Sequence, residues 1–127
     1  MKVAFCTQDS IEINEHFGRA KQIIVYNVNK DGFNLDGIRN YEPIDGSKEH
    51  KIDTEDKIST LKDCSILYLA DIGGPAAAAV IRSKIHPVKV TKPVKIEEIL
   101  KNLTSKINDN PPPWIRKILM MENNHKH

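Results

Sequence analysis

Cysteine is scarce in this sequence: only Cys6 and Cys64 occur among 127 residues, and 57 residues separate them. Two distant cysteines exclude a disulfide-rich scaffold. They also exclude a zinc site or a self-contained iron–sulfur site, because such sites need clustered Cys or Cys/His ligands. Each cysteine lies inside a strand-like apolar run, so the residues alone indicate buried, inert thiols.

Long hydrophobic runs are also missing. No stretch approaches the roughly 18 apolar residues of a membrane span, and the first six residues lack the features of a secretion signal. We therefore expect a soluble, cytoplasmic protein without a membrane partner. The charges nearly cancel, with 19 Lys and Arg against 17 Asp and Glu, a net +2. So weak a field argues against nucleic acid as a partner.

What the sequence does contain is an alternation of apolar runs and amphipathic segments. Asp31-Gly32 predicts a hairpin between two strands, residues 42–51 are expected to form a loop, and Asp53 is a candidate helix cap. The predicted strands cover residues 2–7, 22–29, 33–41, 64–70 and 85–90. The predicted helices cover residues 53–63, 76–84, 96–107 and 114–121.

This order of elements predicts one α/β domain with a mixed sheet, parallel in its second half and flanked by helices. With 39% hydrophobic residues, a chain of this length forms a core without disulfides or metals. The Pro-rich stretch 110–113 is the single linker-like segment. We expect residues 1–110 to form the α/β domain and residues 111–127 a Pro-rich, partly disordered C-terminal extension.

Two loops follow predicted strands at positions where α/β sheets bind ligands, residues 8–19 and 71–75. If the two strands are neighbours, both loops open on one edge of the sheet. Gly73 and Gly74 precede a helix, so the backbone can approach a ligand and the free amides of the helix start attract anions. The other interpretation of the glycine pair is a tight strand-to-helix turn.

The first loop contains His16, Phe17, Gly18 and Arg19. A histidine beside an aromatic residue and a glycine can present an imidazole nitrogen to a soft metal centre. Arg19 can neutralise an anionic ligand with its planar set of donors. The other interpretation of His16 is a surface histidine that caps a turn.

Two other functions remain open on the residues alone. Asp9 and Asp71, at the ends of neighbouring strands, could bind Mg²⁺ in a nuclease, with Glu12 and Glu15 as the nearest further acids. The same two aspartates are equally typical of turns and caps. Alternatively, the basic region 82–106 and the Pro-rich tail could serve a protein–protein adaptor without any ligand.

Several segments together resemble the NifX/NafY family of nitrogenase cofactor-assembly proteins, and the similarity runs from about residue 1 to residue 119. The first are Met1-Lys2-Val3-Ala4-Phe5, His16-Phe17-Gly18 and Asp63-Cys64-Ser65-Ile66-Leu67-Tyr68. The others are Ile72-Gly73-Gly74-Pro75-Ala76-Ala77-Ala78, Lys84-Ile85-His86-Pro87-Val88-Lys89-Val90 and Asn110-Pro111-Pro112-Pro113-Trp114-Ile115-Arg116-Lys117.

The resemblance implies a ribonuclease-H-like domain with a mixed five-stranded sheet and a function without catalysis. It implies that the protein binds and transfers an iron–sulfur precursor of the iron–molybdenum cofactor, of the type made by NifB, and exchanges it with the NifEN scaffold. The candidate cluster ligand maps onto His16, and the glycine pair maps onto Gly73 and Gly74. The resemblance makes residues 1–110 the cofactor-binding domain. Cys6 and Cys64 match no ligand pattern of the family and are kept as candidate auxiliary ligands.

Overall fold

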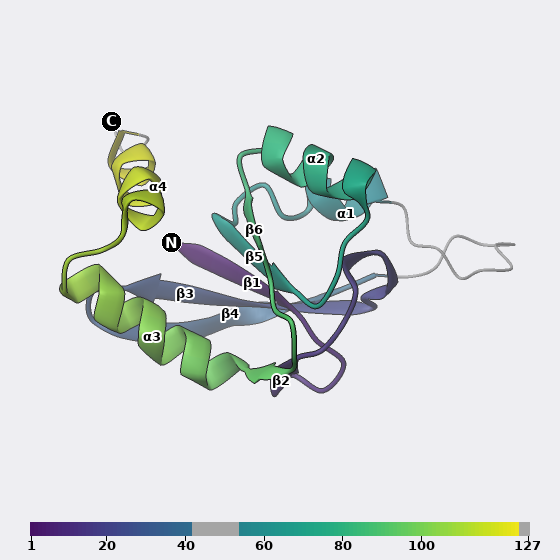
Figure 1. Ribbon diagram of the computed structural model, residues 1–127, viewed down its shortest axis with the longest axis horizontal. Helices are drawn as coiled ribbons and strands as arrows, with labels where there is room; N and C mark the ends of the chain where they lie inside the picture. Colours follow the sequence, from purple (N-terminus) through teal and green to yellow (C-terminus); the bar gives the residue numbers. More distant parts are fainter. Residues whose placement is uncertain (42–53, 125–127) are drawn as a thin grey trace, which may run out of the picture.

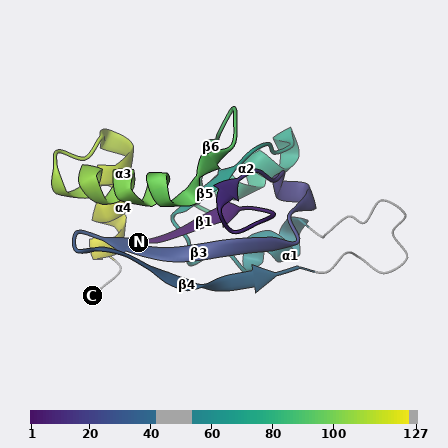
Figure 2. The ribbon, with the colours of Figure 1, turned by 90° about the horizontal axis from the view of Figure 1, so that it is seen from below.

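The computed structural model describes residues 1–41 and 54–124, which form a five-stranded mixed sheet with helices on both faces (Figures 1 and 2). The strand order is β4-β3-β1-β5-β6. Strands β1, β3 and β4 pair antiparallel, whereas β1, β5 and β6 pair parallel. The strands are β1 (Lys2–Cys6), β3 (Gln22–Asn29), β4 (Gly32–Asn40), β5 (Ile66–Leu69) and β6 (His86–Lys89). This is the mixed sheet predicted from the order of elements, in the ribonuclease-H-like arrangement that the family resemblance implies.

The predicted hairpin joins β3 to β4. The turn places Gly32 at a φ of 138°, a conformation that favours glycine, and the Asn29 side chain accepts a hydrogen bond from the amide of Asp31 at 2.8 Å. Register runs from Asn29 opposite Gly32 to Gln22 opposite Asn40. The hairpin forms the antiparallel half of the sheet, and β4 is the outermost strand on that side.

Side chains alternate along the strands, so the sheet has apolar side chains on both faces. Two helices pack against the side chains of each face. Ala4 and Cys6 of β1 face α1 (Thr54–Ser59) and α2 (Gly74–Arg82). Val3 and Phe5 face the other way, towards α3 (Ile96–Asn108) and α4 (Pro113–Asn124). The two resulting clusters of buried apolar side chains form the core on either side of the sheet.

Helix α4, which the sequence predicts over residues 114–121, packs onto the domain. Ile115 is fully buried in the cluster beneath α3 and α4. The Trp114 ring stacks on His86 at 4.7 Å. Glu122 accepts a hydrogen bond from Ser65 at 2.9 Å and lies 3.6 Å from the N-terminal ammonium. Apolar residues on one face of the segment explain this docking.

Three short elements were not predicted. Strands β2 (Glu12–Ile13) and β7 (Val94–Lys95) form a small antiparallel pair, and η1 (Phe17–Arg19) is a single 3₁₀ turn. All lie in segments too short to show a periodic pattern. The predicted loop over residues 42–51 and the Asp53 cap lie outside the described residues. Within the described residues, no helix is long and apolar enough to cross a membrane.

Candidate functional site

The loop that carries His16 is hydrogen-bonded to the chain that leaves β5. His16 and Asp71 form an isolated parallel β-bridge. The amide of Phe17 donates to the Asp71 carbonyl at 2.9 Å, and the amide of Ala70 donates to the Glu15 carbonyl at 3.0 Å. Because β1 and β5 are parallel neighbours, both loops open on the same edge of the sheet. The expected proximity of these two loops is confirmed.

The His16 side chain is about half exposed, at 51%, and faces the Asp71 carboxylate. Its Nδ1 lies 3.6 Å from Oδ2 of Asp71, while Oδ1 of Asp71 lies 3.2 Å from Nζ of Lys89 and accepts the Ile72 amide at 2.9 Å. The hydrogen bond from Lys89 is the main reason that the pKa of Asp71 is lowered. A carboxylate at Nδ1 leaves Nε2 of His16 as the nitrogen available to a ligand.

Two residues after Asp71, helix α2 begins with an open N-terminus. Its N-cap residue is Gly73, which has no side chain to cap the helix, and Gly74 and Pro75 follow. A Cβ added at Gly73 or Gly74 would meet no heavy atom of the described residues within 4 Å. Gly73 has an ordinary φ of −70°, so the backbone does not require glycine there. No side chain caps the amides of this helix start, and the start of a helix attracts anions.

Phe17 holds the loop in place and does not form part of its surface. Its ring is fully buried in the core cluster against α1 and α2. Its carbonyl accepts a hydrogen bond from Nζ of Lys57 at 2.5 Å, and the same ammonium lies 5.1 Å from the centre of the ring. Phe17, a candidate cofactor-binding residue in the sequence, thus lies beneath the loop with no exposed surface, whereas His16 beside it is exposed.

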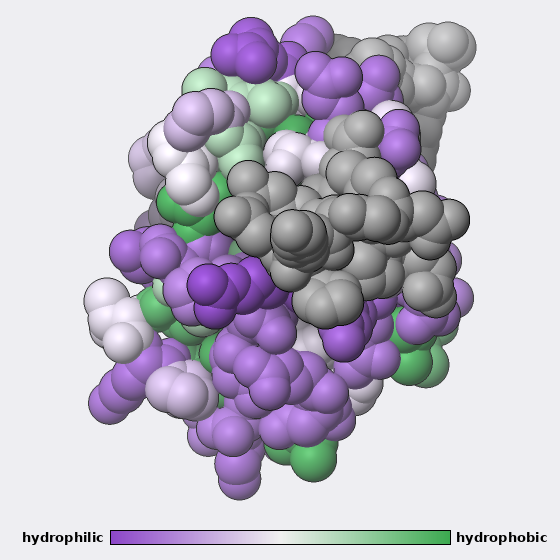
Figure 3. All heavy atoms as spheres, turned by 90° about the vertical axis from the view of Figure 1, so that its right-hand side faces the viewer, coloured by the Kyte–Doolittle hydropathy of each residue, from purple (hydrophilic) through white to green (hydrophobic). Residues whose placement is uncertain are grey.

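Gly18 and Arg19 complete the turn on its exposed side. A Cβ at Gly18 would meet no described heavy atom within 4 Å. Arg19 lines a polar surface groove of about 390 Å³, together with Thr7, Gln8, Glu15, Lys21, Gln22 and Asn40. The face towards which β1 runs, on the right of Figure 1, is mainly hydrophilic where it is not covered by grey residues (Figure 3). This surface suits an anionic ligand better than an apolar one.

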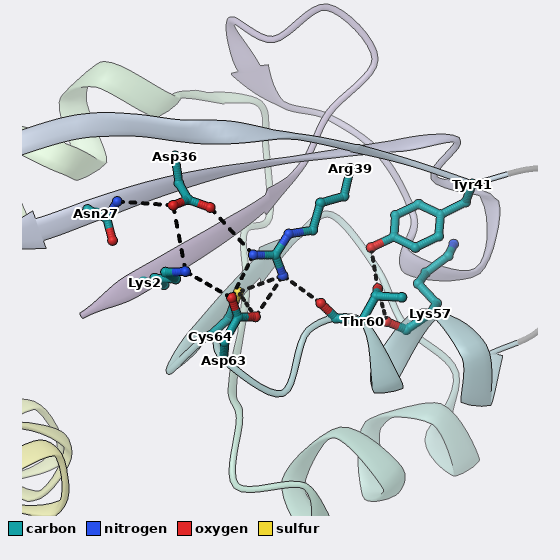
Figure 4. A network of polar contacts seen from close by, with 9 residues as sticks. All are labelled: Lys2, Asn27, Asp36, Arg39, Tyr41, Lys57, Thr60, Asp63 and Cys64. Carbon is teal, nitrogen blue, oxygen red and sulfur yellow. Dashed lines mark hydrogen bonds and ion pairs between the residues drawn. The ribbon is translucent and has the colours of Figure 1, made fainter. Parts of the chain in front are cut away.

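The structure does not bring the two cysteines together with His16 as ligands. Cys64 precedes β5 and so lies at the opposite end of that strand from Asp71, next to Arg39 and Asp63 (Figure 4). Cys6 ends β1 but is fully buried. Burial raises the pKa of both thiols to about 12. Because a thiolate is the form that binds metal, neither side chain is prepared for that role.

Asp9 and Asp71 are both engaged by their own loops. Oδ1 of Asp9 accepts the amides of Ile11 at 2.9 Å and Glu12 at 3.0 Å, and these bonds lower the pKa of Asp9. Asp71 pairs with Lys89, as described above. In the described part of the chain, no group of three His, Cys, Asp or Glu side chains could hold a metal ion. This arrangement does not favour a divalent-metal nuclease.

Sequence reasoning missed two residues of this edge, Lys57 and Lys89. Lys57 lies in a short helix that follows a charged segment, where a lysine is normally exposed. Lys89 is placed beside Asp71 by the parallel pairing of β5 with β6, in which Leu69 is opposite Lys89. The strand register, once known, would have indicated Lys89. The sequence carries no comparable signal for Lys57.

The chain belongs to the family described as "Dinitrogenase iron-molybdenum cofactor", whose model matches residues 1–106. It is 38% identical over 124 residues to the protein NifX of Sinorhizobium fredii, a match that covers 94% of this chain and 78% of that protein. It is also 34% identical over 90 residues to the FeMo cofactor biosynthesis protein NifB of Bradyrhizobium diazoefficiens, covering 68% of this chain and 17% of that protein.

Among solved structures, the crystal structure of PH0822 is similar to this chain. The TM-score is 0.60 with 19% sequence identity, and the match covers 90% of this chain and 97% of that one. This likeness extends to the fold alone. Family membership and the named relatives connect the chain with nitrogen fixation and with the biosynthesis of the iron–molybdenum cofactor.

Proposed function

We propose that this protein is a non-enzymatic carrier that binds and transfers an iron–sulfur precursor of the iron–molybdenum cofactor, of the type made by NifB. The family and the relatives named NifX and NifB support the assembly context. One structural observation supports cluster binding in particular. The His16 loop is hydrogen-bonded to Asp71, which lies two residues before Gly73, the N-cap of α2. One metal-binding side chain and a set of anion-binding amides thus share one edge of the sheet.

Each group at this edge would contribute a different interaction with the cluster. Nε2 of His16 would bind one iron atom, since Nδ1 faces Asp71. The amides at Gly73 and Gly74 and the cationic side chains of Arg19 and Lys89 would face the bridging sulfides, which carry negative charge. A preassembled cluster needs no full set of thiolate ligands, so the buried state of Cys6 and Cys64 is compatible with this role.

A site with a single exchangeable ligand also explains how the cargo would be released. A full thiolate set would hold the cluster too tightly for transfer, whereas one imidazole bond is readily replaced by a ligand of the acceptor. In this proposal NifB supplies the cluster, and the NifEN scaffold receives it. The only bond that changes in this proposal is the one between His16 and iron, which a ligand of the acceptor replaces. The cluster itself is passed on unaltered.

Anaerobic titration with the isolated NifB cluster product tests the proposal, with binding followed by the broad absorption that the cluster adds. We expect His16→Ala to weaken binding by at least about tenfold without unfolding the chain, because the exposed imidazole contributes little packing. His86→Gln is the control, because it removes an imidazole at the amino end of β6, away from the site. Since the His86 ring stacks on Trp114, thermal unfolding is measured on both variants. Equal affinity of wild type and His16→Ala would remove His16 from the site.

A further inference from the structure

Lys57 in α1 is fully buried, which is rare for a lysine. Its ammonium donates hydrogen bonds to the main-chain carbonyls of Phe17 at 2.5 Å and Ala20 at 3.0 Å. These two carbonyls stand at the two ends of the turn η1, the segment that follows His16. One side chain from a distant part of the chain therefore holds both ends of the turn η1.

The turn has little strength of its own. Within it, the Arg19 amide donates to the His16 carbonyl at 3.1 Å, and the Ala20 amide donates to the Phe17 carbonyl at 3.4 Å, a long hydrogen bond. A single 3₁₀ turn is a poor structure in isolation. The bonds from Lys57 are shorter and charge-assisted, so they restrain the carbonyls of Phe17 and Ala20 more strongly than the turn's own two hydrogen bonds do.

The surroundings of Lys57 fix the position of its ammonium. The ammonium lies 5.1 Å from the ring centre of Phe17 and 5.3 Å from that of Tyr41. The Tyr41 hydroxyl lies 2.7 Å from the Thr60 hydroxyl, which donates to the Lys57 carbonyl at 2.7 Å (Figure 4). The two aromatic rings and the Tyr41–Thr60 hydroxyl pair thus surround the Lys57 side chain and restrict its position.

Burial of a cation opposes folding unless hydrogen bonds or an ion pair compensate for the lost hydration. Both hydrogen-bond acceptors of the ammonium among the described residues are carbonyls without formal charge, and removal of a charge from water is costly. Burial accordingly lowers the pKa of Lys57 to about 8. An apolar side chain would fill the same space without this cost, but it would leave the Phe17 and Ala20 carbonyls without their donor.

We propose that Lys57 is the positioning residue of the cluster site: it fixes the turn η1 from below and thereby holds His16 beside Asp71 and the start of α2. This inference rests on the proposed function for the role of His16, but the position of the loop can be measured without any cluster. Lys57 itself does not touch the cargo, since its side chain has no exposed surface.

Lys57→Met tests this, because methionine has a similar length and no donor. In the cluster-free protein we expect the amides of Arg19 and Ala20 to exchange with solvent at least about tenfold faster and the imidazole NMR signals of His16 to shift. We expect the affinity for the isolated NifB cluster product to fall at least about fivefold. The control is Ile58→Ala, which lowers the stability of the same helix and the same core cluster without removing a donor to the loop.

The outcomes separate the two proposals. Faster exchange and shifted His16 signals in Lys57→Met, but not in Ile58→Ala, support the positioning role. Unchanged loop signals in Lys57→Met, or the same change in both variants, overturn it, because a general loss of stability would then explain the result. If wild type binds no cluster, the proposed function fails, and the cluster-free measurements still decide the role of Lys57.

Discussion

At the scale of single residues, Asp71 does two things for the site. Its carbonyl accepts the amide of Phe17 and so joins the histidine loop to the sheet. Its carboxylate lies between the His16 imidazole and the Lys89 ammonium. A substitution of the side chain leaves the first interaction intact, so the two contributions can be separated by experiment.

We expect Asp71→Asn to weaken binding of the NifB cluster product between about threefold and tenfold while the fold is kept. The amide no longer attracts Nδ1 of His16 as the carboxylate does, so the imidazole loses part of its orientation. Anaerobic titration measures the effect, and Asp109→Asn, an exposed carboxylate at the end of α3, is the control. Full affinity in Asp71→Asn would mean that the carboxylate does not orient the ligand.

A second residue-scale prediction concerns Asp63, at the opposite end of β5. Arg39 donates to its carboxylate from both terminal nitrogens at 2.7 Å, and Lys2 donates at 3.1 Å (Figure 4). The hydrogen bonds from Arg39 are the main reason that the pKa of Asp63 lies well below its usual range. The pKa is thus lower in the folded than in the unfolded chain, where it is about 3.9.

The sign of the pH effect follows from this difference. The ionised Asp63 contributes fully to the free energy of unfolding above about pH 5, and the contribution is lost as the pH falls below about 4. Between pH 6 and pH 3, wild type should lose about 1 kcal/mol more than Asp63→Asn, a value reduced for the partial exposure of the pair. Urea unfolding at both pH values measures this. Parallel losses in the two proteins would show that the pair contributes nothing.

At the scale of the elements, the start of α2 is the feature with the clearest structural test. Neither Gly73 nor Gly74 is needed for close packing, since a Cβ at either position meets open space. Gly74 is helical and precedes Pro75, and proline disfavours a side chain on a helical residue before it. A methyl group at position 74 would therefore cost some stability but keep the fold, and it would occupy space beside the helix start.

We expect Gly74→Ala to keep the fold with a somewhat lower melting temperature, because residue 74 is helical and precedes Pro75. We expect the affinity for the cluster product to fall by about fivefold or more, because the methyl group keeps the anion away from the amides. Gly37→Ala in β4 is a matched control, since a Cβ there also meets no described heavy atom within 4 Å. Titration and thermal unfolding are measured on both variants. Unaltered affinity of Gly74→Ala would exclude contact between the cluster and this helix start.

The elements also show how far the sequence alone leads. The apolar runs between the amphipathic segments predicted all five strands of the main sheet. The loops that follow β1 and β5 were expected at one edge of the sheet, because parallel strands have their carboxyl ends at the same edge. The patterns failed for β2 and β7, because two residues carry no periodicity. They also failed for the contact of α4 with β6, since the stacking of Trp114 on His86 joins residues far apart in the chain.

The site was predictable in part for the same physical reasons. His16 and the glycine pair stand in loops that follow strands, so topology indicated their proximity. The burial of Phe17 and Lys57 was not predictable, because it depends on how α1 packs against the turn η1. A lysine inside a core has no sequence pattern that distinguishes it from a lysine on the surface.

At the scale of the whole molecule, the two ends of the parallel strands have different characters. One edge carries His16, Asp71, Lys89 and the start of α2. The other is closed by α4 and the N-terminus, and it contains a groove of about 280 Å³ lined by residues that include Cys64, Met121 and Glu122. The proposed function depends on the first edge being the binding site.

The most direct test of this claim is to map the bound cluster on the molecule by NMR, with ¹⁵N-labelled protein titrated anaerobically with the NifB cluster product. We expect the amide signals of residues 16–19, 71–74 and 76–77 to shift or broaden first, while those of residues 62–65 and 118–122 stay unchanged; Pro75 has no amide proton. Perturbation confined to the second set, with the first set unaffected, would contradict the account.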